Sequence, residues 1–422
     1  MHRITVAALA VAVAASGCAG ANSPLETSAP PLARANADNT PPMARSLSPQ
    51  PAGFTAWRDG FRARALQQGI SSQVFDAAFQ GVGLNSEVIR LDSRQAEFTK
   101  PIWEYLESAA SPDRVASGRA QHARLDGTLA AIEARYGVDG EAVLAIWGME
   151  SNYGGHRGSI PVVESLATLA YEGRRRSFAE EQLMAALRIL QSGDVAPQNM
   201  VGSWAGAMGH TQFIPTSYLS YAVDFTGDGR RDIWSDDPTD ALASAANYLA
   251  KSGWQRGRPW GVEVRLPQGF NYGSADQSNI RPVADWRGRG VTAVDGSSLP
   301  DHGPAAIVAP AGARGPAFAV YRNFFVIKRY NNATSYAMGV GHLGDRIAGG
   351  GPFQGAWPRG ERELSRTEKI ELQERLTARG YPTGKTDGVI GPDTIAAIRA
   401  YQSREGLTPD GFATTTLLAR LR

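Results

Sequence analysis

The chain has 422 residues, enough for about two or three domains, and its 42% hydrophobic and 20% charged residues are typical of a globular protein. The formal net charge of +2 at pH 7 argues against a nucleic-acid-binding protein, because such proteins need a strongly basic face. This charge does not exclude a sugar polymer or a polyanion as partner.

The first 18 residues have the pattern of a secretion signal. After Arg3, an apolar stretch over residues 4–15 has the length of a signal-peptide core and is shorter than the about 20 residues of a membrane span. The small residues before Cys18, the only cysteine, resemble a bacterial lipobox, and Ala19 fits retention at the outer membrane. We expect a periplasmic protein that is lipid-anchored to the outer membrane of a Gram-negative bacterium. The alternative is ordinary signal cleavage, which would release a soluble periplasmic protein.

The pattern after the signal changes from a tether to helices. Residues 19–50 are rich in Ala, Pro, Ser and Asn, contain no aromatic residue and are expected to form a flexible tether. From Phe54 to Lys251 the pattern is mostly helical. One helix has apolar residues at helical spacing and ends before Gly137, and another is expected from Phe178 to Gln191, with Gly193 after its end.

A further helix, for which Asp139 is a plausible N-cap, ends at Glu150. Val143, Ile146 and Trp147 share a face with Glu150, since residues three and four apart are neighbours on a helix. A charged carboxyl on an apolar face is costly, so burial should raise its pKa toward that of a proton donor at neutral pH. The segment alone equally allows a Glu at a fraying helix end that points to solvent.

Small residues are frequent in two segments, one directly after Glu150 and the other further along the sequence. Gly154 and Gly155 are expected to stop the helix and to leave room for a substrate. In residues 203–215 small residues let the backbone approach a ligand, and polar or soft side chains can contact it. These residues are Ser203, Gly206, Ala207, Met208, Gly209 and Gln212. Alone, such a segment is more often a tight turn between packed helices.

An acidic loop over residues 224–235 has the opening of an EF-hand calcium loop. The candidate ligands at alternate positions are Asp224, Thr226, Asp228 and Arg230. Gly229 is sixth, but the twelfth residue is Ser235 instead of Glu, so the signature is incomplete. A late carboxylate could come from Asp236, Asp237 or Asp240. The loop is expected to hold a structural Ca²⁺ or Na⁺, and the alternative is an Asp-Gly turn with exposed acids.

Residues 254–320 have a different composition. Gly and Pro are frequent, and residues 262–266 alternate in the manner of a strand. Residues 324–327, Phe-Phe-Val-Ile, are also β-prone. These patterns predict a small β-containing insert within the helical domain, and residues 349–363 are expected to form a linker.

The C-terminal residues 364–422 are predicted to form a separate module. A helix around Leu372 ends at Gly380, and Asp-Gly turns at Asp387 and Asp410 each precede a further helix. This doubled pattern resembles the C-terminal peptidoglycan-binding domain of bacterial cell-wall enzymes, which is a small three-helix module. The alternative is a small helical domain with another use.

Three motifs carry a resemblance over residues 54–344. They are Glu150-Ser151-Asn152-Tyr153-Gly154, the segment 203–215 and the segment 330–337. In this order they resemble the lytic murein transglycosylase B family, glycoside hydrolase family 103. The resemblance implies a mainly α fold, with a lysozyme-like helical catalytic domain over residues 51–348 that contains the small β insert and is followed by the three-helix module.

The resemblance also implies roles for single residues. Glu150 matches the catalytic Glu of the family, and Asp240 aligns with the distal ligand of its calcium site. The residues that match its glycan groove are Ser203, Met208, Gln212, Tyr248, Tyr330, Asn331 and Tyr336. His210 and Thr211 depart from the family, which often has an aromatic residue and Pro at these positions.

The implied reaction needs a single carboxyl and no cofactor. Ordinary glycosidases use two carboxylates, and the three motifs contain no second one with a clear catalytic role. Glu150 would protonate the oxygen between N-acetylmuramic acid and N-acetylglucosamine, and would then take the proton of the C6 hydroxyl that attacks C1. The product would end in 1,6-anhydromuramic acid.

The expected partners are peptidoglycan glycan strands and, through the lipid anchor at Cys18, a membrane; the chain is expected to be a monomer. A muramidase that uses water is an alternative within the same class. A non-catalytic lipoprotein that tethers the membrane to the wall is the alternative from another class. A carboxyl on an apolar helix face favours the enzyme, since a tether does not need it.

Overall fold

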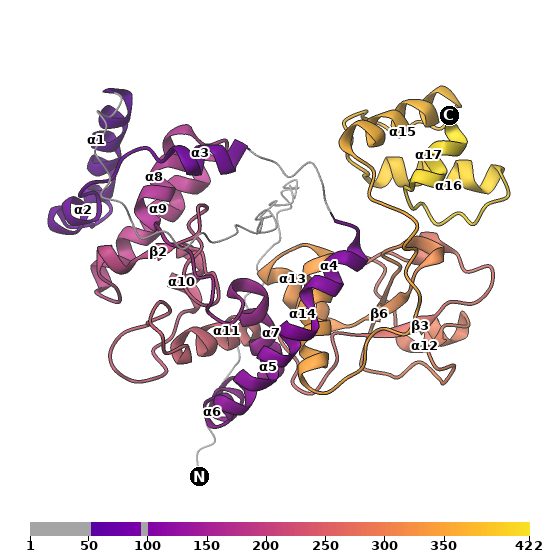
Figure 1. The fold of residues 1–422 in the computed structure, drawn as a ribbon, viewed down its shortest axis with the longest axis horizontal. Coiled ribbons are helices and arrows are strands. Elements are labelled where there is room, and N and C mark those ends of the chain that lie inside the picture. Colours follow the sequence, from indigo (N-terminus) through magenta and orange to yellow (C-terminus); the bar gives the residue numbers. More distant parts are fainter. Residues whose placement is uncertain (1–51, 94–99) are drawn as a thin grey trace, which may run out of the picture.

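The computed structural model describes residues 52–93 and 100–422. The expected signal segment, Cys18 and the tether lie outside them. Helices dominate the described chain (Figure 1). They are α1 Ala52–Gln67, α2 Ser72–Ala78, α3 Ser86–Ser93, α4 Ile102–Ala109, α5 Pro112–Arg124, α6 Asp126–Tyr136, α7 Gly140–Ser151, α8 Val162–Glu172, α9 Arg176–Ser192, α10 Pro215–Tyr221, α11 Thr239–Lys251, α12 Val283–Gly288, α13 Arg322–Tyr330, α14 Thr334–Ile347, α15 Arg366–Ala378, α16 Pro392–Arg404 and α17 Thr415–Leu421.

The strands are short and antiparallel. They are β1 Ile160–Pro161, β2 Val201–Gly202, β3 Gly261–Arg265, β4 Thr292–Ala293, β5 Ala306–Val308 and β6 Ala317–Val320. β1 pairs with β2, and the other strands form a sheet in the order β4-β3-β6-β5. The mainly α architecture with a small β insert is therefore confirmed. None of the described helices has both the length and the apolar character that a membrane span requires.

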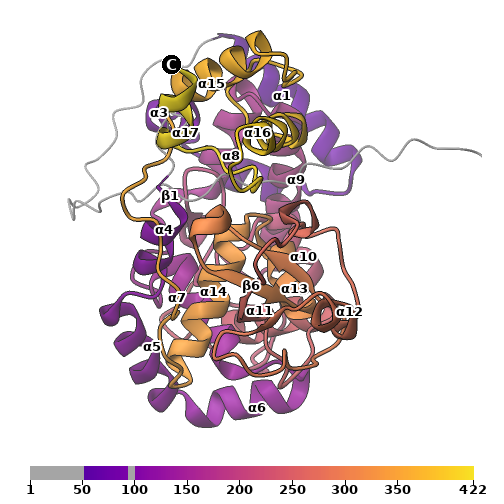
Figure 2. The same ribbon diagram turned by 90° about the vertical axis from the view of Figure 1, so that its right-hand side faces the viewer.

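Two hydrophobic cores organise the helical part. One lies among α1, α2, α8, α9 and α10, and the other lies among α4 to α7, α11, α13, α14 and one face of the larger sheet. Figure 2 shows α14 between α7 and the sheet. Tyr248 and Tyr330 pack against both cores, so these tyrosines mark the seam where the two cores meet.

Helix ends follow the expected signals at two places. Gly137 and Gly193 cap α6 and α9 in the left-handed conformation, with φ of 65° and 80°. The β-prone interpretation of residues 324–327 is wrong, because these residues lie in α13. Asn323, Phe324, Val326 and Ile327 are buried there at helical spacing, so packing on the second core outweighs their strand propensity.

The larger sheet packs on both of its faces. In β6, Phe318 and Val320 belong to the second helical core, whereas Ala317 and Ala319 face a smaller core around Trp286 of α12. Successive strand residues point to opposite faces, so a strand covered on both sides is apolar throughout. The insert is thereby fixed onto the helical part.

The expected linker over residues 349–363 contains no helix or strand, but it packs on the protein. Phe353 stacks on His342 with ring centroids 3.8 Å apart and contacts Phe318 at 4.8 Å. Trp357 also packs on the second helical core. The Glu263 carboxylate of β3 accepts hydrogen bonds from the backbone N–H groups of residues 354 and 355.

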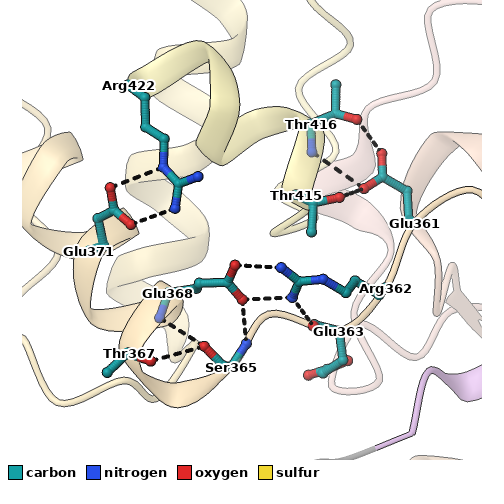
Figure 3. A network of polar contacts seen from close by, with 10 residues as sticks. All are labelled: Glu361, Arg362, Glu363, Ser365, Thr367, Glu368, Glu371, Thr415, Thr416 and Arg422. Atoms are coloured by element: carbon teal, nitrogen blue, oxygen red, sulfur yellow. Dashed lines mark hydrogen bonds and ion pairs between the residues drawn. The ribbon is translucent and has the colours of Figure 1, made fainter.

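The three helices α15, α16 and α17 form the C-terminal module around a core of their own. Figure 3 shows how this module joins the chain that precedes it. The buried Glu361 accepts hydrogen bonds from the hydroxyls of Thr415 and Thr416 at 2.5 and 2.6 Å, and Arg314 of the insert pairs with it at 2.6 Å. Burial alone would raise the pKa of Glu361, but these bonds outweigh it and lower the pKa to about 2. The module is therefore docked on the insert.

Candidate active site

The Glu150 side chain lies in the last turn of α7. Val143, Ile146 and Trp147 on the same helix are buried, at no more than 1% exposure, whereas Glu150 remains partly exposed. Asp139 occupies the expected N-cap position, but its carboxylate binds Trp254 and a loop N–H instead of its own helix. The apolar core thus fixes the helix, and Glu150 at its end is only partly exposed.

Burial raises the pKa of Glu150 to about 7, as the sequence predicts for a carboxyl on an apolar face. A hydrogen bond from the Tyr336 hydroxyl opposes this shift, because it stabilises the charged form. No other carboxylate within the described residues contributes to the shift. A group with this pKa is protonated in about half of the molecules at neutral pH, which suits a general acid.

Tyrosines surround the carboxyl. The Tyr336 hydroxyl donates to Glu150 Oε1 at 2.5 Å, and the Tyr330 hydroxyl donates to the carbonyl oxygen of Thr211 at 2.6 Å. The rings of Tyr248 and Tyr330 lie 4.8 Å apart. The negative charge of Glu150 raises the pKa of Tyr330, in addition to the larger effect of burial. These hydroxyls therefore remain protonated and act as donors.

The three sequence motifs converge at this point. Tyr336 of the third motif binds Glu150 of the first, and Tyr330 of the third binds Thr211 of the second. The first and second motifs are joined by Ser151, whose Oγ donates to the carbonyl oxygen of residue 210 at 2.6 Å. Segments that are far apart in sequence thus form one connected site.

The turn after Glu150 differs from the expected glycine stop. Asn152 is the C-cap, and Asn152 and Tyr153 have φ of 50° and 56°, in the left-handed region that L-residues rarely adopt. Gly154, at φ 85°, and Gly155 lie within the same turn, and the N–H of Gly155 donates to the carbonyl oxygen of Asn152. The Tyr153 hydroxyl donates to the carbonyl oxygen of Arg114, which attaches the turn to α5.

The glycines of segment 203–215 approach protein instead of open space. A Cβ on Gly206 would lie 2.6 Å from the Leu166 side chain, and one on Gly209 would lie 2.2 Å from the Ile233 carbonyl oxygen. Met208 is fully buried. For these three positions the structure supports the tight-turn interpretation, because close packing within the protein explains each of them.

The remaining groove candidates are only partly buried. The Ser203 hydroxyl accepts the N–H groups of Ala205 and Ala207 and so shapes the turn. Gln212, at φ 51°, donates to the carbonyl oxygens of Arg157 and Gly209. Asn331 Oδ1 accepts the N–H of Ala333 just before α14. Each of these side chains is held in place by backbone bonds.

Two residues around the end of α7 were not predicted as site residues from the sequence. Burial, with the charge of Glu150 as a smaller cause, raises the pKa of Tyr105 of α4, which therefore lies near the carboxyl. His210 bonds to Trp147. Tyr105 stands in an ordinary amphipathic helix, so no local signal marks it. His210 was noted only because it departs from the family pattern.

Carboxylates also converge in the acidic loop. One oxygen each from Asp224, Asp228 and Asp240 lie within 4.8 Å of one another. Backbone N–H groups of the loop lower the pKa of Asp224, although burial opposes this, whereas burial and the Asp224 charge raise that of Asp240. Clustered carboxylate oxygens are the ligands that a hard cation such as Ca²⁺ prefers. The donor set therefore fits this ion.

The other residues considered for this ion site have different surroundings. The Thr226 hydroxyl lies 3.4 Å from Asp224, and the Arg230 N–H donates to Asp228. Asp236 pairs with Arg157 at 2.8 Å, and Asp237 binds the hydroxyl and N–H of Thr239. Of the three late acids, Asp240 alone joins the cluster among the residues described.

Comparisons with known proteins identify two families along the chain. Residues 53–345 match the transglycosylase SLT domain, and residues 365–421 match a peptidoglycan binding domain. Membrane-bound lytic murein transglycosylase B of Escherichia coli strain K12 is 33% identical over 307 residues, which are 69% of this chain and 80% of that protein.

Solved structures give the same result. SltB3 from Pseudomonas aeruginosa, in complex with NAG-anhNAM-pentapeptide, superposes with a TM-score of 0.85 and 54% identity over 88% of this chain and all of that one. The Escherichia coli lytic transglycosylase Slt35 in complex with calcium gives 0.60 and 29% identity over 70% of this chain and 93% of that one. The chain therefore belongs to the lytic murein transglycosylase B family and carries a C-terminal peptidoglycan-binding domain.

Proposed function

We propose that Glu150 is the single catalytic carboxyl of this peptidoglycan lytic transglycosylase, and that the enzyme cleaves the β-1,4 bond between N-acetylmuramic acid and N-acetylglucosamine. The observation that carries the proposal is the placement of Glu150. Its pKa is raised to about 7, it receives a 2.5 Å hydrogen bond from Tyr336, and it lies at the meeting point of the three motifs.

In the first step Glu150 acts as the acid. The bond between muramic C1 and the bridging oxygen breaks, and the Glu150 proton goes to that oxygen on the departing N-acetylglucosamine. The acetamido oxygen of the muramic residue forms a bond to C1 and carries the positive charge that develops. Tyr336 then stabilises the new carboxylate, because its hydroxyl donates to Glu150 Oε1.

In the second step Glu150 acts as the base. The C6 hydroxyl of the same sugar attacks C1 and displaces the acetamido oxygen, while its proton returns to Glu150. The result is a 1,6-anhydromuramic end and a regenerated Glu150 acid. The reaction therefore consumes no water and needs no second carboxyl. The relative SltB3 has been solved with a ligand of this anhydro type, which supports the same outcome here.

The sugar is proposed to lie along the seam between the two helical cores. Tyr248 and Tyr330 pack against both cores at this seam, and Gln212 and Asn331 are likewise partly exposed. The two rings would offer stacking surfaces, and the two amides would bind sugar hydroxyls. Ser203 and Met208 would act less directly, since Ser203 shapes its turn. Met208 would support the wall from behind.

The outer parts of the chain would bring the enzyme to its polymer. A lipid on Cys18 would hold it at the outer membrane on the periplasmic side, and the docked C-terminal module would bind the wall. Replacing Cys18 with Ala removes the residue that would carry the acyl chains. Because several such chains are needed for stable anchoring, the protein should move from the membrane fraction to the soluble fraction. Unchanged fractionation would contradict the lipid anchor.

We also propose that the acidic loop holds Ca²⁺, or Na⁺, as a structural ion. Asp224, Asp228 and Asp240 would supply carboxylate oxygens, with Thr226 and Arg230 beside them in the loop. The ion would neutralise three converging negative charges. It would take no part in bond cleavage.

Glu150→Gln tests the catalytic assignment. The amide keeps the shape but cannot donate and accept the proton, so turnover should fall by about 10²–10⁴-fold while wall binding remains. Glu141→Gln, in the first turn of the same helix, is the matched control and should retain activity.

Mass spectrometry of the products distinguishes the remaining alternatives. Anhydro ends that disappear in Glu150→Gln support the proposal. Reducing ends would indicate a muramidase, and wild-type turnover in Glu150→Gln would exclude the single-carboxyl mechanism. If wild-type protein binds sacculi and releases no fragment, the tether alternative holds.

A further inference from the structure

The side chain of His210 connects the helix of Glu150 to the segment that leaves the acidic loop. Trp147 Nε1 lies 3.0 Å from His210 Nδ1, and His210 Nε2 lies 2.7 Å from the carbonyl oxygen of Ser235. Since an indole N–H can only donate, Nδ1 must accept, and Nε2 must carry the proton that it donates to Ser235. Both ring nitrogens of this buried histidine are therefore used, and Arg157 donates to the same Ser235 carbonyl oxygen at 2.7 Å.

His210 also holds the strained turn that follows Glu150. Asn152 and Tyr153 of this turn have positive φ, a conformation that persists only where the surrounding structure enforces it. Ser151 Oγ donates to the His210 carbonyl oxygen at 2.6 Å and accepts the N–H of Gly154 at 3.0 Å. A Cβ on Gly154 would lie 2.7 Å from the imidazole ring, so no space remains between them.

The hydrogen-bond chain continues from His210 to the acidic loop. Beyond Ser235, the Asp232 carboxylate accepts the N–H groups of Trp234 and Ser235 at 2.8 and 3.1 Å. The N–H of Asp232 in turn donates to Asp240 Oδ2 at 3.0 Å. An unbroken series of bonds thus joins Asp240 to Trp147, which lies one helical turn before the proton donor.

We propose that His210 is a positioning residue that fixes the last turn of α7, and thereby Glu150, against residues 233–235. This inference rests on the proposed function of Glu150. The imidazole ring makes two different hydrogen bonds, one at each nitrogen. A residue that only filled space between α7 and residues 233–235 would need neither bond.

Three variants at this position separate the two bonds. His210→Asn places an amide oxygen near the position of Nδ1, so it keeps an acceptor for Trp147 and loses the hydrogen bond to the Ser235 carbonyl oxygen. His210→Gln places an amide nitrogen near Nε2, so it keeps the donor to Ser235 and leaves the indole N–H unpaired. His210→Phe fills the space and makes neither bond.

Two control variants act elsewhere. Tyr218→Phe removes the hydroxyl that donates to the Arg231 carbonyl oxygen at 2.6 Å, so it loosens the end of the acidic loop without touching His210. His122→Asn changes a histidine on α5, whose side chain lies 3.5 Å from Glu141. Both should retain the kcat and pH profile of the wild type, although Tyr218→Phe should melt at a lower temperature.

The measurements are kcat and KM on soluble glycan chains, the pH profile of kcat/KM, and the ¹H–¹⁵N NMR resonance of the Trp147 indole, assigned with Trp147→Phe. For His210→Phe we expect kcat to fall by about 10- to 100-fold with KM nearly unchanged, because a misplaced catalytic group costs this much. The alkaline limb of the kcat/KM profile should move to lower pH, because water that reaches Glu150 lowers the pKa of its carboxyl. The kcat values of His210→Asn and His210→Gln should lie between those of His210→Phe and the wild type. The Trp147 indole resonance should move more in His210→Gln than in His210→Asn.

Wild-type kcat and an unmoved pH profile in His210→Phe, with only a lower melting temperature, would overturn the proposal. If His210→Phe does not fold, unchanged kcat in both amide variants overturns it equally. The indole resonance separates this inference from the proposed function. If the wild type forms no anhydro product, the proposed function fails, whereas a resonance that His210→Gln does not move shows that His210 does not hold Trp147.

Discussion

At the scale of single residues, the position of Glu150 accounts for its chemistry. The apolar face of α7 places the carboxyl beside Trp147 and Ile146, and the helix ends before the carboxyl is fully enclosed. Burial raises its pKa, while the residue keeps part of its surface exposed. The same placement has a thermodynamic cost, because a carboxyl that binds a proton too tightly destabilises the fold once it ionises.

The raised pKa of Glu150 predicts that activity and stability both fall as the pH rises. The acid form donates the proton, so kcat/KM should fall as the pH rises through about 7. The folded state binds this proton more tightly than the unfolded state, whose pKa is 4.5, so the stability it gives is complete below pH 4.5 and is lost as the pH rises to 7. Glu150→Gln should therefore be more stable than wild type at pH 8, by about 1–3 kcal/mol, and similar at pH 4.

Urea unfolding of both proteins at pH 4 and pH 8 measures this difference, with Glu141→Gln as the control on the same helix. An equal gap at the two pH values would show that Glu150 has an ordinary pKa in the folded protein.

Replacement of Tyr336 should shift the pH profile in the other direction from the His210 variants. Tyr336→Phe removes the hydrogen bond that stabilises the Glu150 carboxylate, so the pKa of Glu150 should rise and the alkaline limb should move to higher pH. The rate should fall by about tenfold, since the carboxylate of the intermediate loses a charge-assisted donor. A limb that stays in place in steady-state assays from pH 5 to 9 would contradict this role.

At the scale of elements, loops and turns position the site residues more than the helices do. The turn at residues 151–154, the segment 203–215 and the acidic loop all meet around α7, and each is held by side-chain bonds to the backbone. Such bonds satisfy buried polar groups where no helix or sheet can do so. These loops are therefore rigid parts of the scaffold.

Occupation of the acidic loop should stabilise the protein. An ion that binds the folded state alone raises stability with its concentration, so CaCl₂ should raise the melting temperature of the wild type. Asp224→Asn removes one of the converging carboxylates and should reduce this increase strongly. Asp237→Asn, whose carboxylate binds Thr239 outside the cluster, is the matched control and should respond as the wild type does. Identical calcium responses in all three proteins would contradict the ion site.

At the scale of the whole molecule, the C-terminal module is held on the insert. Arg314 pairs with Glu361, Asp410 accepts the N–H of Ala313, and Arg399 donates to the carbonyl oxygen of Tyr272. Figure 1 shows the module beside the sheet and away from α1 and α2. The module and the catalytic part each have a core, so their functions should be separable. The residue at which the chain is cut should determine how stable the catalytic part remains.

A chain that ends at residue 360 should keep the catalytic part folded, because Phe353 and Trp357 remain on the second helical core. A chain that ends at residue 349 removes both aromatic residues and should melt at a lower temperature. With the longer of the two, activity on soluble glycan should persist, whereas activity on sacculi should fall more, because the module raises the local concentration of enzyme at the polymer. Equal fractional losses on both substrates would argue for a structural role only.

The sequence alone determined what local rules can determine. Helical spacing located α6, α7 and α9, glycines marked two helix ends, and alternation located β3. The apolar face of α7 indicated a raised pKa for Glu150, and the structure decided between this and a solvent-facing Glu at a fraying helix end. These predictions depend on neighbours within a few residues along one chain segment.

The tertiary structure decided what depends on distant segments. Residues 324–327 became helical because the second core covers them, and Gly206 and Gly209 proved to permit packing against Leu166 and Ile233. The bond between Tyr336 and Glu150 and the bridge made by His210 join segments 186 and 63 residues apart. No local pattern encodes such pairs, because the contact exists only once both cores have formed and the strained turn after α7 is held between them.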